Sequence, residues 1–323
     1  MSDVSDTASS SVSAMLSSVS GWRDHLDGDR AVDVAHLDDA LGLPLREEAY
    51  VRALLDPRGH VFQRLEYVGD ALLDAVLLQQ LVLLEPWSEP SLAAVNGEQQ
   101  ALVSDHALGR VAARRGLPEV RTFTVSRQRL ADRIEAAIGA AWADSGLAAA
   151  EEVASRLVVT PGLADLPRVA GVPDPGVGIP EGGVGDDRFE LAARVCGHDP
   201  VNVAWYAAAA HPGPSRRRLA VVGNAVLEAA CATAQYVEDP LATEAQMSEE
   251  RRVATSNAVL AGRARDLGLV AHDDAGDRRA VADEVQALVG AVTLDAGTAA
   301  GLGVAASVLG RTYAPGPVPP RRD

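Results

Sequence analysis

RLEYVGDALLD, residues 64–74, is the stretch of the sequence that decides the fold. Its apolar residues recur at helical spacing and form one stripe, which predicts a helix packed into a core. Glu66, Asp70 and Asp74 follow one another at intervals of four residues and share another face of that helix. Like charges at this spacing repel each other by roughly 0.2–0.5 kcal/mol per pair. The carboxylate row therefore indicates either a solvated face or a functional site.

A second acidic helix is predicted by ADRIEAAIG, residues 131–139. It places Asp132 and Glu135 three residues apart on one face, again beside an apolar stripe. Two such helices can pool four carboxylates. Together the two stretches resemble the signature of the ribonuclease III endonuclease domain, in which an Arg-Leu-Glu-aromatic-aliphatic-Gly-Asp helix meets a later Ala-Asp-x-x-Glu-Ala helix.

The resemblance implies a site and an activity. Carried over position by position, it makes Glu66, Asp70, Asp132 and Glu135 the ligands of a divalent metal, with Asp70 and Glu135 as the principal catalytic residues. The implied cofactor is Mg²⁺, with Mn²⁺ as a substitute, and the implied reaction is hydrolysis of phosphodiester bonds in RNA. One departure is that Phe62-Gln63 stands where the family usually has Asn-Glu, so a neighbouring acidic contact is missing.

The pattern repeats about 150 residues further on, which predicts a duplicated domain. RLAVVGNAVL, residues 218–227, repeats the first signature, and ADEVQALVG, residues 282–290, repeats the second. Their apolar stripes are intact, but three of the four carboxylates are replaced. The exchanged positions are Ala220, Asn224 and Gln286, and only Asp283 is retained. A divalent ion depends on anionic oxygen ligands, so we expect the second copy to bind no metal and to be inert.

Composition supports a helical protein with little general affinity for nucleic acid. Of the residues, 47% are hydrophobic and 4% aromatic, and Ala and Leu dominate, which favours an all-α fold. All 29 basic residues are Arg, and the net charge is −16. Any RNA binding is therefore expected to be local or metal-assisted. Cys196 and Cys231 are too few for a disulfide framework and predict a reducing, cytoplasmic setting. No stretch predicts a membrane span.

We predict five segments and one architecture. The segments are a disordered 1–20, an intact domain 21–159, a Pro/Gly-rich linker 160–186, a degenerate domain 187–313 and a flexible tail 314–323. Because ribonuclease III domains work as dimers, the resemblance implies that the two halves pair within one monomeric chain. The expected substrate is double-stranded or structured RNA. Two alternatives stay open, namely a non-catalytic RNA or ribosome-associated scaffold, and a metalloenzyme of this fold acting on a small non-nucleic substrate.

Overall fold

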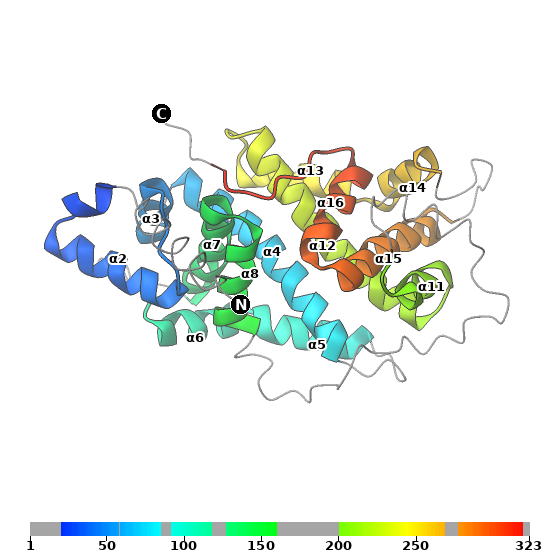
Figure 1. The fold of residues 1–323 in the computed structure, drawn as a ribbon, viewed down its shortest axis with the longest axis horizontal. Helices are drawn as coiled ribbons and strands as arrows, with labels where there is room; N and C mark the ends of the chain where they lie inside the picture. Colours follow the sequence, from blue (N-terminus) through cyan, green and yellow to red (C-terminus); the bar gives the residue numbers. More distant parts are fainter. Residues whose placement is uncertain are drawn as a thin grey trace, which may run out of the picture.

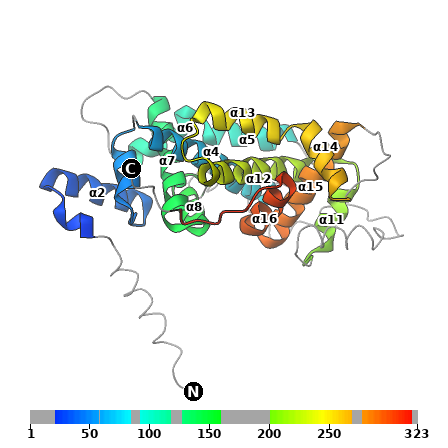
Figure 2. The same cartoon turned by 90° about the horizontal axis from the view of Figure 1, so that it is seen from above.

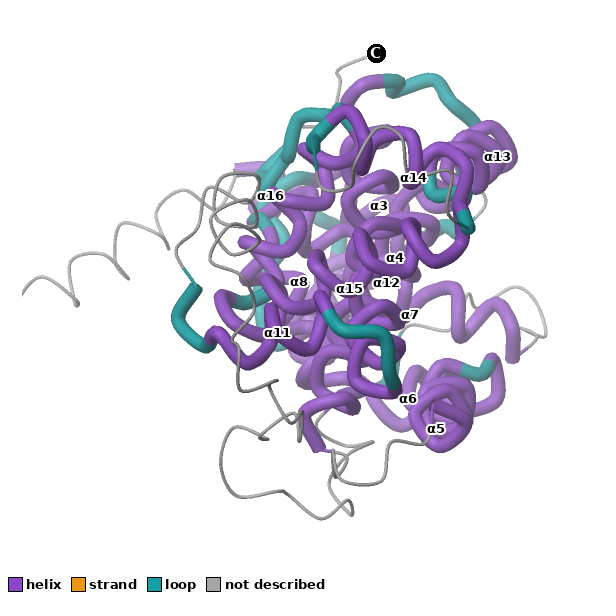
Figure 3. Tube along the Cα trace, turned by 90° about the vertical axis from the view of Figure 1, so that its right-hand side faces the viewer, coloured by secondary structure: helices purple, strands orange, loops and turns teal. Residues whose placement is uncertain are grey.

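The computed structural model describes most of the chain, and every structural statement below refers to that part: residues 21–57, 59–84, 92–117, 127–159, 200–268 and 277–318. All regular elements in these ranges are helices, without any strand, which confirms the all-α prediction (Figure 3). The predicted N-terminal segment and linker, and Cys196, lie outside the described residues. None of the described helices is both long and apolar enough to cross a membrane.

The first half begins with three short elements and then forms the signature helix. Its elements are η1 Gly21–His25, α2 Gly28–Leu41, α3 Glu48–Leu55, α4 His60–Leu84, α5 Leu92–Val103, α6 Asp105–Arg115, α7 Arg127–Ser145, α8 Leu147–Ala154 and the π-helical turn η2 Ser155–Val159. Gly42 ends α2 in a left-handed conformation that glycine adopts without strain. Ser104 separates α5 from α6 because its side chain accepts a hydrogen bond from the Ala107 amide and caps α6.

The second half contains a matching set of helices. These are α11 Val203–Ala210, α12 Pro214–Glu238, α13 Glu244–Ala254, α14 Asn257–Asp266, α15 Arg278–Ala296 and α16 Thr298–Leu309. Helices α4 and α12 both contain 25 residues, and α7 and α15 both contain 19. The two carboxylate-bearing stretches of the first half, and their counterparts in the second, therefore stand on helices of equal length.

In the first half, α4 and α7 cross with their backbones in direct contact. A Cβ atom added to Gly69 would lie 1.7 Å from the carbonyl oxygen of Glu135, and one added to Gly139 would lie 2.0 Å from that of Leu65. Both distances are far below van der Waals contact, so only glycine fits on either side of the crossing. The crossing brings the acidic faces of the two helices together.

The same crossing recurs between α12 and α15. A Cβ atom on Gly223 would lie 1.7 Å from the carbonyl oxygen of Gln286, and one on Gly290 would lie 2.1 Å from that of Leu219. These four residues stand at the positions of the repeated sequence signatures. The local backbone geometry of the two halves is thus the same where their side chains differ.

Helices α4 and α12 also pack against each other, and Figures 1 and 2 show them side by side in the middle of the molecule. Arg64 is buried at one end of this contact. Its guanidinium donates to the carbonyl oxygens of Tyr236 (2.7 Å), Asp239 (3.0 Å) and Pro240. The last carbonyls of a helix have no intrahelical partner and carry partial negative charge. Arg64 of the first half therefore caps the C-terminus of α12.

Further hydrogen bonds join the two halves along these helices. The Tyr67 hydroxyl lies 2.9 Å from Gln235 Oε1 and 3.0 Å from the carbonyl oxygen of Met247. Gln79 donates to the carbonyl of Thr293 (3.2 Å) and accepts a hydrogen bond from Thr298 (2.9 Å). Polar groups of the first half are thus satisfied by the second, as buried polar groups require.

The predicted flexible tail is wrong for residues 314–318. This segment runs from α16 back to the first half, as the dark red stretch in Figure 2 shows. The Leu147 amide donates to the Pro315 carbonyl (3.0 Å), and the Val318 amide donates to the Ala143 carbonyl (2.6 Å). Tyr50 also donates to the Val318 carbonyl. The high proline content suggested a frayed end, but proline carbonyls remain good acceptors for a neighbouring domain.

Candidate metal centre

Three of the four predicted ligands meet where α4 crosses α7. One carboxylate oxygen from each of Glu66, Asp132 and Glu135 lies within 4.8 Å of the others. Glu66 stands on α4, and the other two stand on α7 three residues apart, so they share a face of that helix. The glycine crossing explains the approach, because Gly69 lets the α4 backbone touch the carbonyl of Glu135 itself.

Asp70 lies outside this group of three. It stands one turn after Glu66 on α4, is partly buried, and is near enough for its charge to affect both Glu66 and Glu135. Asp74, one turn further on, accepts a hydrogen bond from Gln99 of α5 (2.8 Å). The carboxylate row along α4 is therefore half-buried, and its last member is hydrogen-bonded within the protein, which favours a functional site over a merely solvated face.

The clustered carboxylates disfavour one another's ionisation. Burial, followed by the charges of Asp70 and Glu66, raises the pKa of Glu135 to about 9. Burial, followed by the charge of Asp132, raises the pKa of Glu66 to about 8. The pKa of Asp74 rises to about 6, mainly because it is buried and then because Asp70 is close. Without a cation, Glu66 and Glu135 would hold protons at neutral pH.

The donor set fits a hard divalent cation. Mg²⁺ binds oxygen at about 2.0–2.1 Å, so ligand oxygens on opposite sides of one ion are about 4.2 Å apart. At most one pair of the three can stand opposite each other, and neighbouring ligand oxygens of one ion lie about 3 Å apart. The oxygens of Glu66, Asp132 and Glu135, which lie within 4.8 Å of one another, would therefore draw closer together around a shared ion. All are carboxylates, which Mg²⁺ and Mn²⁺ prefer over sulfur ligands. A bound cation would also offset the mutual repulsion that raises the pKa of these groups.

The second half contributes charged residues to this site through α13. The Arg251 guanidinium lies over the Tyr67 ring, 4.6 Å from its centroid. Burial raises the pKa of Asp70, and the charge of Arg251 opposes that rise. Glu244, also on α13, acts in the opposite direction on Asp70 and Glu66. The sequence around Arg251 could not have identified this role, because no local pattern shows that α13 reaches across to the other half.

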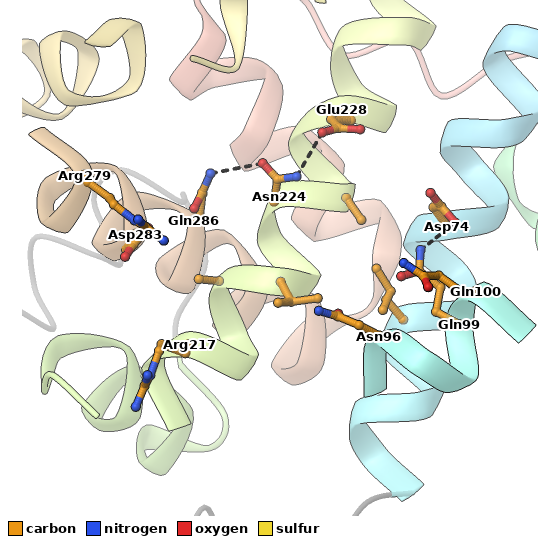
Figure 4. Close-up of a pocket in the computed structure, with 14 residues that line it drawn as sticks. Asp74, Asn96, Gln99, Gln100, Arg217, Asn224, Glu228, Arg279, Asp283 and Gln286 are labelled. Carbon is orange, nitrogen blue, oxygen red and sulfur yellow. Dashed lines mark hydrogen bonds between the residues drawn. The ribbon is translucent and has the colours of Figure 1, made fainter. Parts of the chain in front are cut away.

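The equivalent positions of the second half carry a chain of neutral amides. Gln286 donates to Asn224 (3.0 Å), and Asn224 in turn donates to Glu228 (2.9 Å), as Figure 4 shows. Ala220 offers no ligand atom, and Asp283 is the one carboxylate retained from the signature positions. Among the residues that the structure describes, the acidic groups brought together as a candidate metal site are those of the first half alone.

A cavity of about 500 Å³ opens in front of these amides. Its walls come from α12 and α15 of the second half and from α4 and α5 of the first. The polar residues that line it are Asp74, Asn96, Gln99, Gln100, Arg217, Asn224, Glu228, Arg279, Asp283 and Gln286 (Figure 4). The cavity therefore lies between the two halves, and elements of both line it.

Comparison with known proteins supports the fold. No protein-family model matches the sequence, and no curated protein matches it. The structure is similar to the crystal structure of Dicer from Giardia intestinalis, with a TM-score of 0.54 and 16% identity over 79% of this chain and 55% of that chain. The fold is ribonuclease III-like. A structure of Giardia Dicer refined against twinned data gives a TM-score of 0.53 and 15% identity with the same coverage.

These similarities show the fold of the chain and do not show its activity. At 16% identity, shared architecture does not transfer an activity, and the chain spans only about half the length of the Dicer it matches. The shared fold and the carboxylate cluster occur together in one chain. The roles of Glu66, Asp70, Asp132 and Glu135 stay predictions that rest on the geometry of the site.

Proposed function

We propose that this protein is a metal-dependent endoribonuclease that hydrolyses phosphodiester bonds in double-stranded or structured RNA. One observation carries the proposal: Glu66, Asp132 and Glu135 converge at the α4–α7 crossing, while the geometrically equal α12–α15 crossing has Ala220, Asp283 and Gln286 at the same positions and so keeps one carboxylate of the three. A structural role alone would treat the two crossings alike. Selective retention of carboxylates at one of them supports a chemical role for that one.

The proposal includes a tandem arrangement in which the two halves act as an intramolecular pseudo-dimer. Equal helix lengths and equal glycine crossings support the duplication. The contact between α4 and α12, capped by Arg64, supports the pairing. In this arrangement the second half supplies a partner surface, and Arg251 and Glu244 of α13 stand beside the active site of the first half.

The residues of the first half have distinct roles in the proposed reaction. Glu66, Asp132 and Glu135 hold Mg²⁺, or Mn²⁺ in its place, and Asp70 completes the acidic site from the next turn of α4. A bound divalent ion lowers the pKa of water and offsets negative charge on a phosphoryl group. The rigid glycine crossing fixes the spacing between the two ligand-bearing helices, so the site is organised before the ion binds.

Duplex RNA is the substrate class that suits this arrangement best. An A-form helix presents its 2′-hydroxyls and phosphates in a wide, shallow groove, which proteins recognise mainly by shape. A net charge of −16 disfavours general attraction to nucleic acid. Binding therefore depends on the metal and on a few local donors, and one active site predicts a nick in one strand per binding event.

Cleavage of an end-labelled RNA duplex in Mg²⁺ at low salt tests the proposal. We expect single-strand nicks from the wild type and a loss of at least about 100-fold in Asp70→Asn and Glu135→Gln, since even outer contacts to metal ligands are worth 10–100-fold. The matched control is Glu48→Gln, which removes a half-buried carboxylate of α3 that forms an ion pair with Arg52, away from the α4–α7 crossing. No cleavage by a wild type that binds Mg²⁺ would contradict the proposal and favour a small non-nucleic substrate.

A further inference from the structure

The cavity at the degenerate site has two chemically different edges. Arg217 of α12 and Arg279 of α15 stand at one edge, and Asn96 and Gln100 of α5 stand at the other (Figure 4). All four side chains are exposed, and none makes a hydrogen bond or ion pair with another residue in the described ranges. Two guanidinium groups and two amides are therefore available to a ligand that enters the space.

The polar side chains at the floor of the cavity already have hydrogen-bond partners. Gln286 and Asn224 are joined to each other and to Glu228, and Gln99 is bonded to Asp74. These bonds occupy the amides and two of the three lining carboxylates. The third carboxylate, Asp283, stands four residues after Arg279 on α15, a spacing that places opposite charges next to each other on a helix. The groups left to bind a ligand are donors at the two edges.

Guanidinium groups and amides together match the backbone of RNA. Arginine binds phosphate oxygens through paired N–H donors, and amide side chains hydrogen-bond hydroxyl groups as donor or acceptor. A ribose-phosphate strand offers both partners at a regular repeat, with phosphates on one side and 2′-hydroxyls on the other. At the first-half crossing the carboxylates would repel such a strand unless a cation lay between them. At the second-half crossing amides replace two of these groups and an alanine replaces a third.

We propose that this cavity is a metal-free binding site for the RNA backbone, which holds the uncut strand of a duplex while the first half cuts the other. Arg217 and Arg279 contact phosphate, and Asn96 and Gln100 contact ribose 2′-hydroxyls. The inference rests on the proposed function for its substrate class. It assigns a binding role to the second half. Without such a role, the exchanged carboxylates of that half would indicate only that a catalytic site had been lost.

Binding of a blunt RNA duplex, measured separately from cleavage, tests the assignment. All variants carry Glu135→Gln so that the duplex stays intact. We expect Arg217→Ala with Arg279→Ala to weaken binding by about 10-fold or more, because a hydrogen bond to a charged group contributes about 1.5–3 kcal/mol. The slope of log Kd against log salt concentration should fall by about 1 per arginine removed. The matched control is Arg278→Ala, an exposed arginine next to Arg279 that does not line the cavity.

A second measurement tests the amide edge by chemical substitution in the RNA. Replacing the 2′-hydroxyls of one strand by hydrogen should weaken binding to the parent protein. The same replacement should cost less in Asn96→Ala with Gln100→Ala, because the groups that recognise the hydroxyls are gone. Equal penalties in both proteins, together with unchanged binding of the arginine double variant, would overturn the proposal.

The two proposals fail in different ways. If the wild type does not cleave duplex RNA but binding responds to Arg217 and Arg279, the proposed reaction is wrong and the backbone site stands. If cleavage occurs and depends on Glu135, but the cavity variants bind the duplex as tightly as the parent protein, the proposed nuclease function is supported and the proposed backbone site is wrong. If the protein binds no duplex RNA at all, both are wrong.

Discussion

The two helix crossings of this protein have the same backbone and different chemistry. At each crossing a glycine of the long helix touches a backbone carbonyl of the shorter one, at 1.7 Å from an added Cβ in both cases. At one crossing Glu66, Asp132 and Glu135 converge, while at the other Gln286 and Asn224 form neutral hydrogen bonds. The comparison separates what the fold requires from what the proposed reaction requires. Glycines and apolar stripes specify the fold, and carboxylates can be exchanged without losing it.

Restoring the carboxylates of the second half should remove the chemical difference between the two crossings. The variant that combines Ala220→Glu, Asn224→Asp and Gln286→Glu restores four carboxylates with the retained Asp283. We expect calorimetric titration to show twice as many bound divalent ions as in the wild type, and cleavage of the opposite strand to rise by at least about 10-fold. Adding Asp283→Asn to the rebuilt protein should reverse both gains. An unchanged ion count would show that the carboxylates alone do not account for the difference.

Substitution of the crossing glycines should show that the two halves are structurally equal. Gly69→Ala and Gly223→Ala each place a methyl group on a backbone carbonyl, so each should reduce the free energy of unfolding by about 3 kcal/mol or more. Denaturant unfolding measures this. Gly262→Ala, in α14 with no atom within 4 Å of the added Cβ, is the control and should cause no loss, and up to about 1 kcal/mol of gain, in the free energy of unfolding. A large loss from one crossing glycine alone would contradict the equivalence.

Loss of the Arg64 cap should weaken the contact between the halves. Arg64→Ala removes the donor from three carbonyl groups at the end of α12, and we expect a loss of about 2–3 kcal/mol in the free energy of unfolding. Arg64→Lys keeps the charge without the planar fork and should recover only part of it. Native hydrogen exchange should report the loss at the C-terminal turn of α12. Equal stability of the Ala and Lys variants would show that the charge alone contributes nothing there and that the planar fork of the guanidinium accounts for the whole effect.

The pH dependence of the metal-free protein should be the smallest effect and should come from the first half. Folded Glu66 and Glu135 have pKa values of about 8 and about 9 against an ordinary 4.5, so the folded state holds more protons over this interval. Stability should therefore fall as the pH rises from 5 to 9 in EDTA, by a few °C in the unfolding midpoint. Mg²⁺ or Glu135→Gln should flatten this slope. A slope that persists in Glu135→Gln would assign it to other groups.

The sequence predicts those parts of the molecule that depend on local pattern. Residues 64–74 and 131–139 predicted two acidic helices, and the structure brings Glu66, Asp132 and Glu135 together as expected. The all-α fold also follows from helical periodicity and from the abundance of Ala and Leu. In these cases the information lies within one or two turns of helix, where residue spacing fixes which side chains share a face.

The parts that the sequence did not predict depend on contacts between distant segments. Arg64 reaches carbonyls more than 170 residues away in the chain, and no local pattern identifies a backbone acceptor. The position of α13 beside Asp70 likewise follows from how the halves pack. Residues 314–318 were predicted to be a free tail because proline content describes a segment's own preferences, and it carries no information about a neighbour that binds it.

The repeated glycine crossing has a consequence for how such a sequence can change over generations. Gly223 touches a backbone carbonyl and not a side chain, so no compensating substitution nearby can make room for a larger residue. Asn224, one residue later, meets only other side chains and can be exchanged together with them. We therefore expect relatives of this protein to keep the glycine in both halves, and to vary the neighbouring position freely only in the half without the proposed metal site. An alignment that shows Gly223 replaced as often as Asn224 would contradict this expectation.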